Sequence, residues 1–439
     1  MNLAAVLSWV NELLWGWPLL IFVIAVSVIW TIALGGVQFR CLTRAWHAVF
    51  ASGGCGGTGN VSPRQAFVNT LSANMGNGAF AGMAMAVWAG GPGAGLWVLL
   101  FGFLVMAVRF AEVYVSTDYG KNEPAGATVG GPMLYLADVA SFMPYLYAVF
   151  CLMFGMTIGN AAQANTIAVS MLTAWGVSEY VVCILLTTLV TYVVLGGAAR
   201  VSRFSDALVP LKVGLFFIPS IMLLFYHYAN IIEALRLIVI GALNPSALAG
   251  GALGVTVQQA LRHGTDKTVT ATEAGIGTAA VFFGFTGSKD ATRSALLGML
   301  SSFISMLLCF MVVLCLVASG VWQSGLNSAA LNIAAYATLF GSLAGWIVTT
   351  ISVIFGLGLL VSYAYVMHAV WMFLTGGRWV WGFNILYPAF TAFGSLAAVE
   401  MVWDLGTLAN GMLLMINMFG LLWLLPKMAL KARLSLYGK

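Results

Sequence analysis

Hydrophobic runs long enough to cross a bilayer recur along the whole chain, and only short polar connections separate them. A membrane-spanning helix needs about 20 predominantly apolar residues, and eleven segments of the sequence fit that pattern. The predicted spans are 16–36, 65–90, 92–116, 141–173, 177–196, 206–227, 247–263, 291–320, 336–372, 379–400 and 406–426. The pattern therefore predicts an all-α polytopic membrane protein with about eleven transmembrane helices.

The span at 65–90 contains a glycine-rich stretch, Leu71 to Gly82, whose first half also carries polar side chains. Each glycine costs a helix about 1 kcal/mol relative to alanine, and glycine recurs here at Gly76, Gly78 and Gly82. In hydrocarbon, backbone groups freed by a helix break must be buried in protein or line a cavity. Two interpretations follow: a helix broken at a binding site, or an intact helix that uses small residues for close packing.

A second interruption is predicted in the span at 247–263, which contains Gly250, Gly251 and Gly254. After the first span, the remaining ten form two groups of five, and each group opens with a glycine-interrupted span. Paired interruptions are typical of transporters built from inverted repeats, with the substrate site between the two breaks. The expected organisation is an extra N-terminal helix and connecting segment (1–60), a first five-helix repeat (61–228), an external surface helix (229–246), a second five-helix repeat (247–426) and a cytoplasmic tail (427–439).

Charged residues make up only 7% of the chain, against about 25% in soluble domains. The excess of Lys and Arg marks cytoplasmic loops, so it indicates membrane orientation and not nucleic-acid binding. The expected cytoplasmic loops hold Arg40, Arg44, Arg64, Lys121, Arg200, Arg203, Arg262, Lys267, Lys289, Arg293 and Arg378, the tail adds Lys427, Lys431, Arg433 and Lys439, and the external loops hold Arg236. This asymmetry predicts an external N-terminus and a cytoplasmic C-terminus in the inner membrane of a prokaryote.

Other function classes find little support in the sequence. The six cysteines and four histidines show no metal-ligand spacing. No HExxH or GxSxG motif points to an enzyme, and no filter-like repeat points to a channel. No catalytic residue and no cofactor other than a coupling ion is therefore predicted.

A series of short motifs follows in a characteristic order from about residue 60 to residue 420. The motifs are Ser62-Pro63, Gln65-Ala66, Gly90-Gly91-Pro92-Gly93-Ala94, Phe110-Ala111-Glu112, Gly131-Pro132-Met133, Gly159-Asn160, Gln163, Asn165, Gly196-Gly197, Val209-Pro210, Asn244-Pro245, Arg262, Gly264, Glu273-Ala274-Gly275, Gly277, Asn410-Gly411-Met412 and Asn417. With them the sequence resembles the alanine or glycine:cation symporter family. The resemblance implies a leucine-transporter-type fold, with two inverted five-helix repeats and one extra helix. It also implies uptake of small neutral amino acids, mainly alanine and glycine, driven by Na+ or H+.

The resemblance places the substrate between the two predicted breaks. Backbone N–H groups near Asn77 and Gly78 would bind its carboxylate, as helix N-termini bind anions, and carbonyls of the later glycines would bind its ammonium group. Gln163 and Asn165 either add hydrogen bonds to the substrate or form polar contacts between helices. The expected substrate-binding residues are Asn74, Gly76, Asn77, Gly78, Gln163, Asn165, Gly250, Gly251 and Gly254.

The chain departs from the family at the expected ion site. The resemblance places ion coupling at Ser72, Met75, Phe355 and Gly358, and members of the family carry adjacent threonines or serines where this chain has Gly358 and Leu359. Hydroxyl oxygens are hard ligands of the kind that sodium needs, and leucine offers none. The departure puts sodium coupling in question.

Lys212 lies in the predicted span 206–227, where the family usually has an apolar residue. Some sodium-independent members of the wider superfamily place a lysine on this helix, with its ammonium where sodium would bind. A lysine removed from water can have its pKa lowered by several units, which suits a proton carrier. The alternative is that Lys212 snorkels to the cytoplasmic face. Together with the missing hydroxyls, the extra cation favours proton coupling or uncoupled exchange.

Three further ionisable residues are candidates for gate or structural roles. Arg109 and Glu112 are three residues apart on one helix face and are expected to form an ion pair. Glu273 falls in a segment at about 264–290 that is predicted not to span the membrane. The sequence as a whole predicts a symporter of small neutral amino acids that is proton-coupled through Lys212. The alternatives are a sodium-coupled symporter and a non-transporting amino-acid sensor.

Overall fold

The computed structural model describes residues 3–50, 61–121, 130–243, 257–396 and 400–438. Within these ranges the regular structure is entirely helical. Six helical segments there are long and apolar enough to cross a membrane. The all-helical membrane class predicted from the hydrophobic pattern is confirmed at this level.

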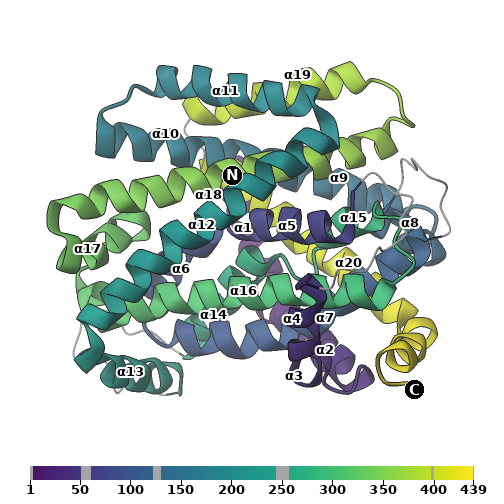
Figure 1. Ribbon diagram of the computed structural model, residues 1–439, viewed down its shortest axis with the longest axis horizontal. Helices are drawn as coiled ribbons and strands as arrows, with labels where there is room; N and C mark the ends of the chain where they lie inside the picture. The colour runs from purple at the N-terminus through teal and green to yellow at the C-terminus, as the bar shows by residue number, and fades with distance from the viewer. Residues whose placement is uncertain (1–2, 51–60, 122–129, 244–256, 397–399, 439) are drawn as a thin grey trace.

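The helices run mostly along the long axis of the molecule (Figure 1). Up to residue 226 they are α1 (Leu3–Leu14), α2 (Trp17–Ala33), α3 (Val37–Arg40), α4 (Leu42–Phe50), α5 (Pro63–Asn74), α6 (Asn77–Gly90), α7 (Ala94–Gly120), α8 (Pro132–Tyr135), α9 (Met143–Met156), α10 (Ala162–Trp175), α11 (Glu179–Leu195) and α12 (Gly197–Tyr226). The later helices are α13 (Ile231–Leu243), α14 (Val257–Thr272), α15 (Thr278–Gly284), α16 (Ala291–Ala318), α17 (Ser328–Phe340), α18 (Ala344–Leu374), α19 (Val380–Leu396) and α20 (Glu400–Tyr437). A π-helical turn, Thr157–Ala161, joins α9 to α10.

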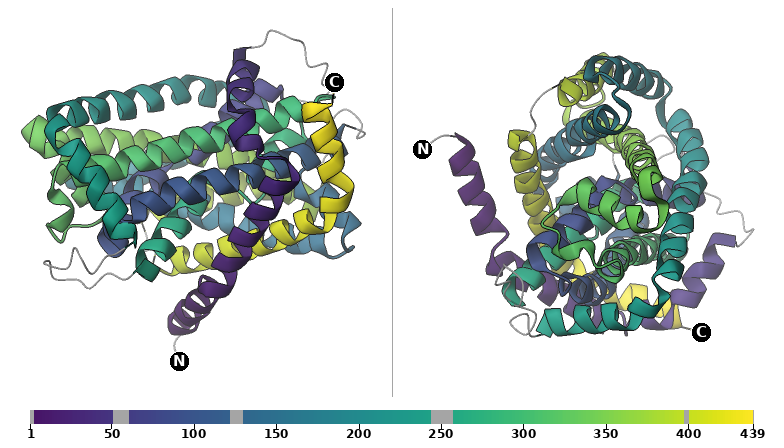
Figure 2. Two further views of the ribbon diagram at one scale, coloured as in Figure 1. Left: turned by 90° about the horizontal axis from the view of Figure 1, so that it is seen from below. Right: turned by 90° about the vertical axis from the view of Figure 1, so that its left-hand side faces the viewer.

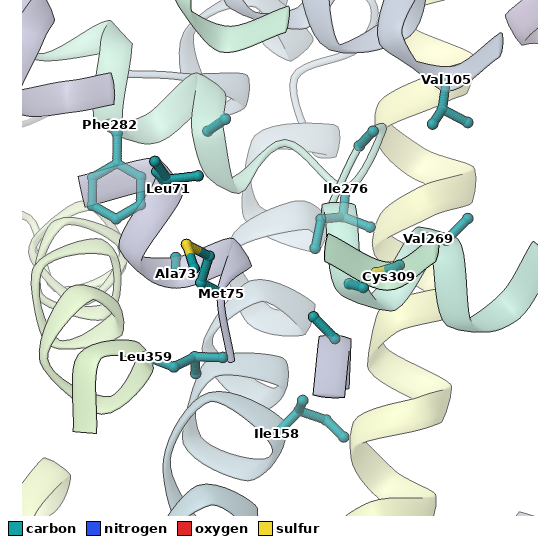
Figure 3. Close-up of a cluster of buried hydrophobic side chains, with 14 of the residues drawn as sticks. Leu71, Ala73, Met75, Val105, Ile158, Val269, Ile276, Phe282, Cys309 and Leu359 are labelled. Atoms are coloured by element: carbon teal, nitrogen blue, oxygen red, sulfur yellow. The ribbon is translucent and has the colours of Figure 1, made fainter. Parts of the chain in front are cut away.

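The first predicted break is confirmed. A capping box between Ser62 and Gln65 starts α5, which ends at Asn74, and α6 begins at Asn77. Between them Gly76 is extended, with φ −108° and ψ −177°. A Cβ atom on Gly76 would lie 2.2 Å from Cδ1 of Leu359, so glycine allows α18 to approach the broken backbone closely. Figure 3 shows Leu71, Ala73 and Met75 beside Leu359 in this buried region.

The structure shows a second break at residues 273–277, later in the chain than the predicted interruption at Gly250, Gly251 and Gly254. The predicted span ended at residue 263, but α14 continues to Thr272, and α15 begins at Thr278. The backbone between them has positive φ at Glu273 (52°), Gly275 (89°) and Gly277 (87°). Residues 273–277 therefore separate α14 from α15, within the segment 264–290 that was predicted not to span the membrane. Gly250, Gly251 and Gly254 lie outside the described residues.

The polar composition of α14 explains why the sequence did not predict the break at residues 273–277. Thr265, Thr268 and Thr272 are buried inside the bundle. The hydroxyls of Thr268 and Thr272 donate to backbone carbonyls four residues earlier, at 2.6 and 2.7 Å, so these two donors are satisfied within the helix. A hydropathy pattern cannot distinguish such a buried polar helix from an exposed loop.

The halves of the two broken helices pack in pairs, α14 against α6 and α15 against α5. In Figure 1, α6 and α14 lie toward the left end with α13 and α17, whereas α5 and α15 lie toward the right. Arg262 and Lys267 were expected in a loop on the same side as Arg64. Both lie instead in α14, beside α6, so that expectation is wrong.

Other helices also pack in pairs that join the two parts of the chain. Helix α7 packs against α16, α10 against α18, and α11 against α19. The last pair lies side by side along one edge of the molecule (Figure 1). Each pair joins one helix from residues 61–226 to one from residues 257–437.

Two predicted boundaries change. The predicted span 336–372 is divided at Gly341, where α17 ends and a short 3₁₀ turn leads into α18. The predicted tail at 427–439 is not a separate tail, because α20 continues through Pro426 to Tyr437. Ion pairs hold this last part to the bundle, since Lys427 contacts Asp138 at 3.0 Å and Lys431 contacts Asp118 at 2.6 Å.

Close backbone contact at Gly394 gives a test of the packing of α19 on the π-helical turn Thr157–Ala161. A Cβ atom there would lie 2.3 Å from the carbonyl oxygen of Ala161, and a backbone atom cannot move aside as a side chain can. Gly394→Ala should lower stability by about 1–3 kcal/mol, the cost of overpacking, seen as a lower Tm in detergent. Gly345→Ala is the matched control, because no atom lies within 4 Å of its added methyl group. Equal Tm values for the two variants would contradict the packing of α19 on the π-helical turn.

Candidate functional site

Lys212 of α12 is fully buried, and its ammonium group lies at the first helix break. Its Nζ donates to the backbone oxygens of Ser72 at 2.7 Å, Met75 at 2.8 Å and Phe355 at 3.2 Å. The carbonyls at a helix end lack partners within the helix, so the lysine satisfies groups that the break has freed. The snorkelling alternative for Lys212 is wrong, since its side chain does not reach the surface.

Gly358 of α18 provides the space for this ammonium group. A Cβ atom on Gly358 would lie 2.2 Å from Nζ and 2.3 Å from Cε of Lys212. It would also lie 2.9 Å from Oγ of Ser72, which donates to the carbonyl of Gly358 at 3.2 Å. Any side chain at position 358 is therefore incompatible with Lys212 in this position. The predicted ion-coupling residues Ser72, Met75, Lys212, Phe355 and Gly358 all meet here.

Asn77 and Gln163, both expected to bind substrate, lie in direct contact. The amide of Asn77 donates to Oε1 of Gln163 at 3.3 Å, and Gln163 donates to the carbonyl of Ile158 at 3.1 Å. Ser352 of α18 donates to Oδ1 of Asn77 at 2.8 Å. The first turn of α6 is thereby tied to α10 and α18. Asn165 lies in α10, half-buried and two residues beyond Gln163.

Asn74, the last residue of α5, is only 2% exposed. Neither atom of its amide has a hydrogen-bond partner among the described residues. An unsatisfied buried polar group costs about 1–3 kcal/mol, so Asn74 carries unused hydrogen-bonding capacity at the break. Gly78 lies nearby in the first turn of α6, where an added Cβ atom would be 3.6 Å from the Thr270 side chain of α14.

A buried network holds the second break. Arg109 and Glu112 of α7 form the expected ion pair at 2.8 Å, with both side chains fully buried. Arg109 also donates to the carbonyl of Thr272, at the end of α14, and to Ser302 at 3.0 Å. The other carboxylate oxygen of Glu112 accepts from the backbone N–H of Gly275 at 3.2 Å. These contacts favour the structural alternative for Arg109 and Glu112.

Two further side chains bind the same break. Asn417 of α20 donates to Glu112 at 3.1 Å and to the carbonyl of Gly275 at 2.8 Å. Tyr147 of α9 donates to the carbonyl of Ile276 at 3.0 Å. The unwound backbone at 273–277 is therefore fixed from α7, α9 and α20.

Glu273 begins the second break and is held by neutral donors. Its carboxylate accepts from Thr278 of α15 and from Tyr363 of α18, both at 2.7 Å. Its positive φ of 52° is uncommon for a residue with a side chain. Because Phe355 and Tyr363 both lie on α18, that helix contacts both breaks.

The chain matches the model of the sodium:alanine symporter family over residues 1–437. The chain belongs to this family.

Similar proteins within the sodium:alanine symporter family include both named and uncharacterised transporters. The chain is 29% identical to an uncharacterized transporter of Haemophilus influenzae, covering 97% of this chain and 94% of the relative. It is 26% identical to the sodium/alanine symporter AgcS of Methanococcus maripaludis, and the match covers 97% of this chain and 95% of AgcS. It is also 26% identical to the "Probable sodium/glutamine symporter GlnT" of Bacillus subtilis, and the match covers 96% of this chain and 88% of GlnT. The symporter family of the chain was thus predicted correctly from its motifs.

Some residues of the site were missed by sequence reasoning. Ser352 lies one helical turn before Phe355, on the same face of α18, and this spacing was an available signal. Tyr363, Tyr147 and Thr278 carry no comparable signal, because buried tyrosines and threonines are common in apolar helices. Their roles depend on where the second break places the Glu273 carboxylate and the Ile276 carbonyl.

The steric relation between Lys212 and Gly358 predicts non-additive effects on stability in this symporter. Gly358→Ala should lower the Tm of the wild-type background, because its methyl group collides with the lysine, at an overpacking cost of about 1–3 kcal/mol. In a Lys212→Ala background the same change should lower the Tm less, because only the contact with Oγ of Ser72 at 2.9 Å remains. Gly214→Ala is the control on α12, where the nearest atom is 3.9 Å from the added methyl group. Equal shifts caused by Gly358→Ala in both backgrounds would contradict the arrangement.

Proposed function

We propose that the chain is a secondary active transporter that carries small neutral amino acids, such as alanine or glycine, across the cytoplasmic membrane by alternating access. The observation that carries the proposal is the pair of buried helix breaks, in a chain that belongs to the sodium:alanine symporter family. Broken helices with free backbone groups are where secondary transporters bind substrates and ions. The printed name of the relative AgcS gives alanine as the first substrate to test.

The fold proposed is a leucine-transporter-type core of two inverted five-helix repeats with one extra helix. The pairing of α6 with α14 and of α5 with α15 supports it, as does the pairing of α7 with α16 and of α11 with α19. The proposed orientation keeps the N-terminus outside and the C-terminus in the cytoplasm. This orientation puts Arg262 and Lys267 in the external half with Arg236. The excess of basic residues would still lie at the cytoplasmic end.

The proposed substrate site lies between the first turn of α6 and the second break. Backbone N–H groups of Asn77 and Gly78 would bind the carboxylate at the helix N-terminus, and the free amide of Asn74 would add a hydrogen bond. Carbonyl oxygens at the second break other than those of Gly275 and Ile276, which already accept from Asn417 and Tyr147, would bind the ammonium group. Gln163 would orient Asn77 through their existing contact.

The coupling ion proposed is H+, carried by Lys212. Three carbonyl oxygens already bind this ammonium group, and no hydroxyl stands at Gly358 or Leu359 to complete a sodium site. Hydrogen bonds from a charged donor are about twice as strong as neutral ones. Loss of the proton would therefore weaken the link from α12 to α5 and α18 and allow the first break to move. The sodium named for the family and for AgcS keeps a sodium-coupled symporter as the alternative, and a non-transporting sensor is the second.

Proteoliposomes with separately imposed sodium and pH gradients test the coupling. Labelled alanine should accumulate with an inward proton gradient and should not depend on sodium. Lys212→Ala should abolish accumulation but keep detectable binding, because Lys212 is proposed to carry the ion and not the substrate. Lys427→Gln, at an exposed ion pair, should behave like the wild type. Sodium-dependent uptake that ignores pH would refute coupling through Lys212, and absence of both uptake and binding would refute amino-acid transport.

Asn74 gives a second test that separates function from stability. Asn74→Leu should keep or raise the Tm, since it removes a buried amide without partners, and should weaken alanine binding by about tenfold, the value of one hydrogen bond of about 1.4 kcal/mol. Asn160→Leu is the control, because that amide donates to Tyr387 and accepts from Thr391, each at 2.8 Å. Asn160→Leu should therefore lower the Tm. Unchanged alanine affinity in Asn74→Leu would remove Asn74 from the substrate site.

A further inference from the structure

The end of α20 meets the segment from Leu34 to Arg44 beside a cluster of three arginines. Tyr437, at the end of α20, donates to the carbonyl of Leu34 at 3.2 Å, and Arg44 of α4 donates to the carbonyl of Leu436 at 2.9 Å. A Cβ atom on Gly35 would lie 3.9 Å from Nη1 of Arg40 and 4.0 Å from Nε of Arg433. We call Arg40, Arg44 and Arg433 the arginine cluster.

No carboxylate neutralises the arginine cluster within the described part of the chain. Two of the acidic groups near this end of the bundle are paired with lysines, Asp118 with Lys121 and Lys431, and Asp138 with Lys427, whereas Asp290 caps α16 by accepting from the backbone N–H of Arg293. None of the three arginines forms an ion pair there. Like charges repel at short range, so an anion that binds several guanidinium groups would relieve this repulsion. Arginine binds phosphate in a bidentate manner.

Exposed apolar side chains flank the arginine cluster on both sides. Helix α4 exposes Trp46 and Phe50, the latter 69% exposed, and α20 exposes Leu430 and Leu434 one turn apart. Figure 2, left, shows the last part of α20 turned across the direction of the long helices. Helices with basic and apolar faces that lie across the bundle are typical of the membrane interface.

We propose that the arginine cluster binds the phosphate of an anionic phospholipid headgroup at the cytoplasmic interface, while Trp46, Phe50, Leu430 and Leu434 contact its acyl chains. Basic pockets between helices on the cytoplasmic side suit such headgroups. The bound lipid joins α3 and α4 to the end of α20 and so stabilises the contact between these helices. This site is separate from the transport site and rests only on the proposed membrane orientation.

The test uses the full-length protein, purified in uncharged detergent and titrated with phosphatidylglycerol, with phosphatidylcholine or with inorganic phosphate. Phosphatidylglycerol should raise the Tm in a saturable manner, because a ligand of the folded state stabilises it. Phosphatidylcholine and free phosphate should not. Each cation near an anionic surface contributes about fivefold in affinity, so Arg40→Gln with Arg433→Gln should weaken phosphatidylglycerol binding by roughly 25-fold.

Two control variants make the result interpretable. Arg236→Gln removes an exposed arginine in α13 that is paired with Glu233, and it should bind phosphatidylglycerol like the wild type. Arg40→Lys with Arg433→Lys keeps the charges and should retain most of the affinity, which separates charge from loss of folding. Equal stabilisation by phosphatidylcholine, or unchanged affinity in the double Gln variant, would overturn the proposal. Saturation by inorganic phosphate alone would assign the arginine cluster to a soluble anion instead.

Discussion

Backbone groups freed at two helix breaks have to find partners in an apolar interior, and the rest of the structure depends on that constraint. Water cannot reach such groups in a bilayer, so protein groups must satisfy them. Both breaks use a buried cation for this purpose: Lys212 at the first and Arg109 at the second. The second cation is balanced by Glu112, whereas Lys212 meets only neutral carbonyl oxygens within the described residues. That difference separates a fixed scaffold from a group able to change charge.

The first break is consequently held by a single cation that no carboxylate balances among the described residues. Its geometry depends on one ammonium group, which joins α12, α5 and α18, and on a glycine that leaves room for it. A metal ion at this position would need additional oxygen ligands, and Gly358 and Leu359 supply none from their side chains. The fold of the sodium:alanine symporter family is therefore compatible with a protein-borne cation in place of a bound one. Because α18 also contacts Glu273 through Tyr363, one helix connects the two breaks.

Much of this architecture was predictable from the sequence. The first break was predicted because Gly76 and its neighbours contradict an apolar helix, and Lys212 stood out as a charge inside a span. The break at 273–277 was not predicted, because the threonines of α14 lower its hydropathy although they are buried. The contacts of Asn417 and Tyr147 could not be predicted, since they depend on the three-dimensional position of carbonyls at 275 and 276. Local patterns report helices and charges, but not which distant donors meet a freed carbonyl.

Direct binding of radioactive sodium to the purified protein tests the central claim, that the Lys212 ammonium group occupies the cation position at the first break. The account predicts no saturable sodium binding to the wild type across the physiological concentration range, because the carbonyls of Ser72, Met75 and Phe355 are already engaged. Saturable sodium binding by the wild type, with Lys212 present, would contradict it.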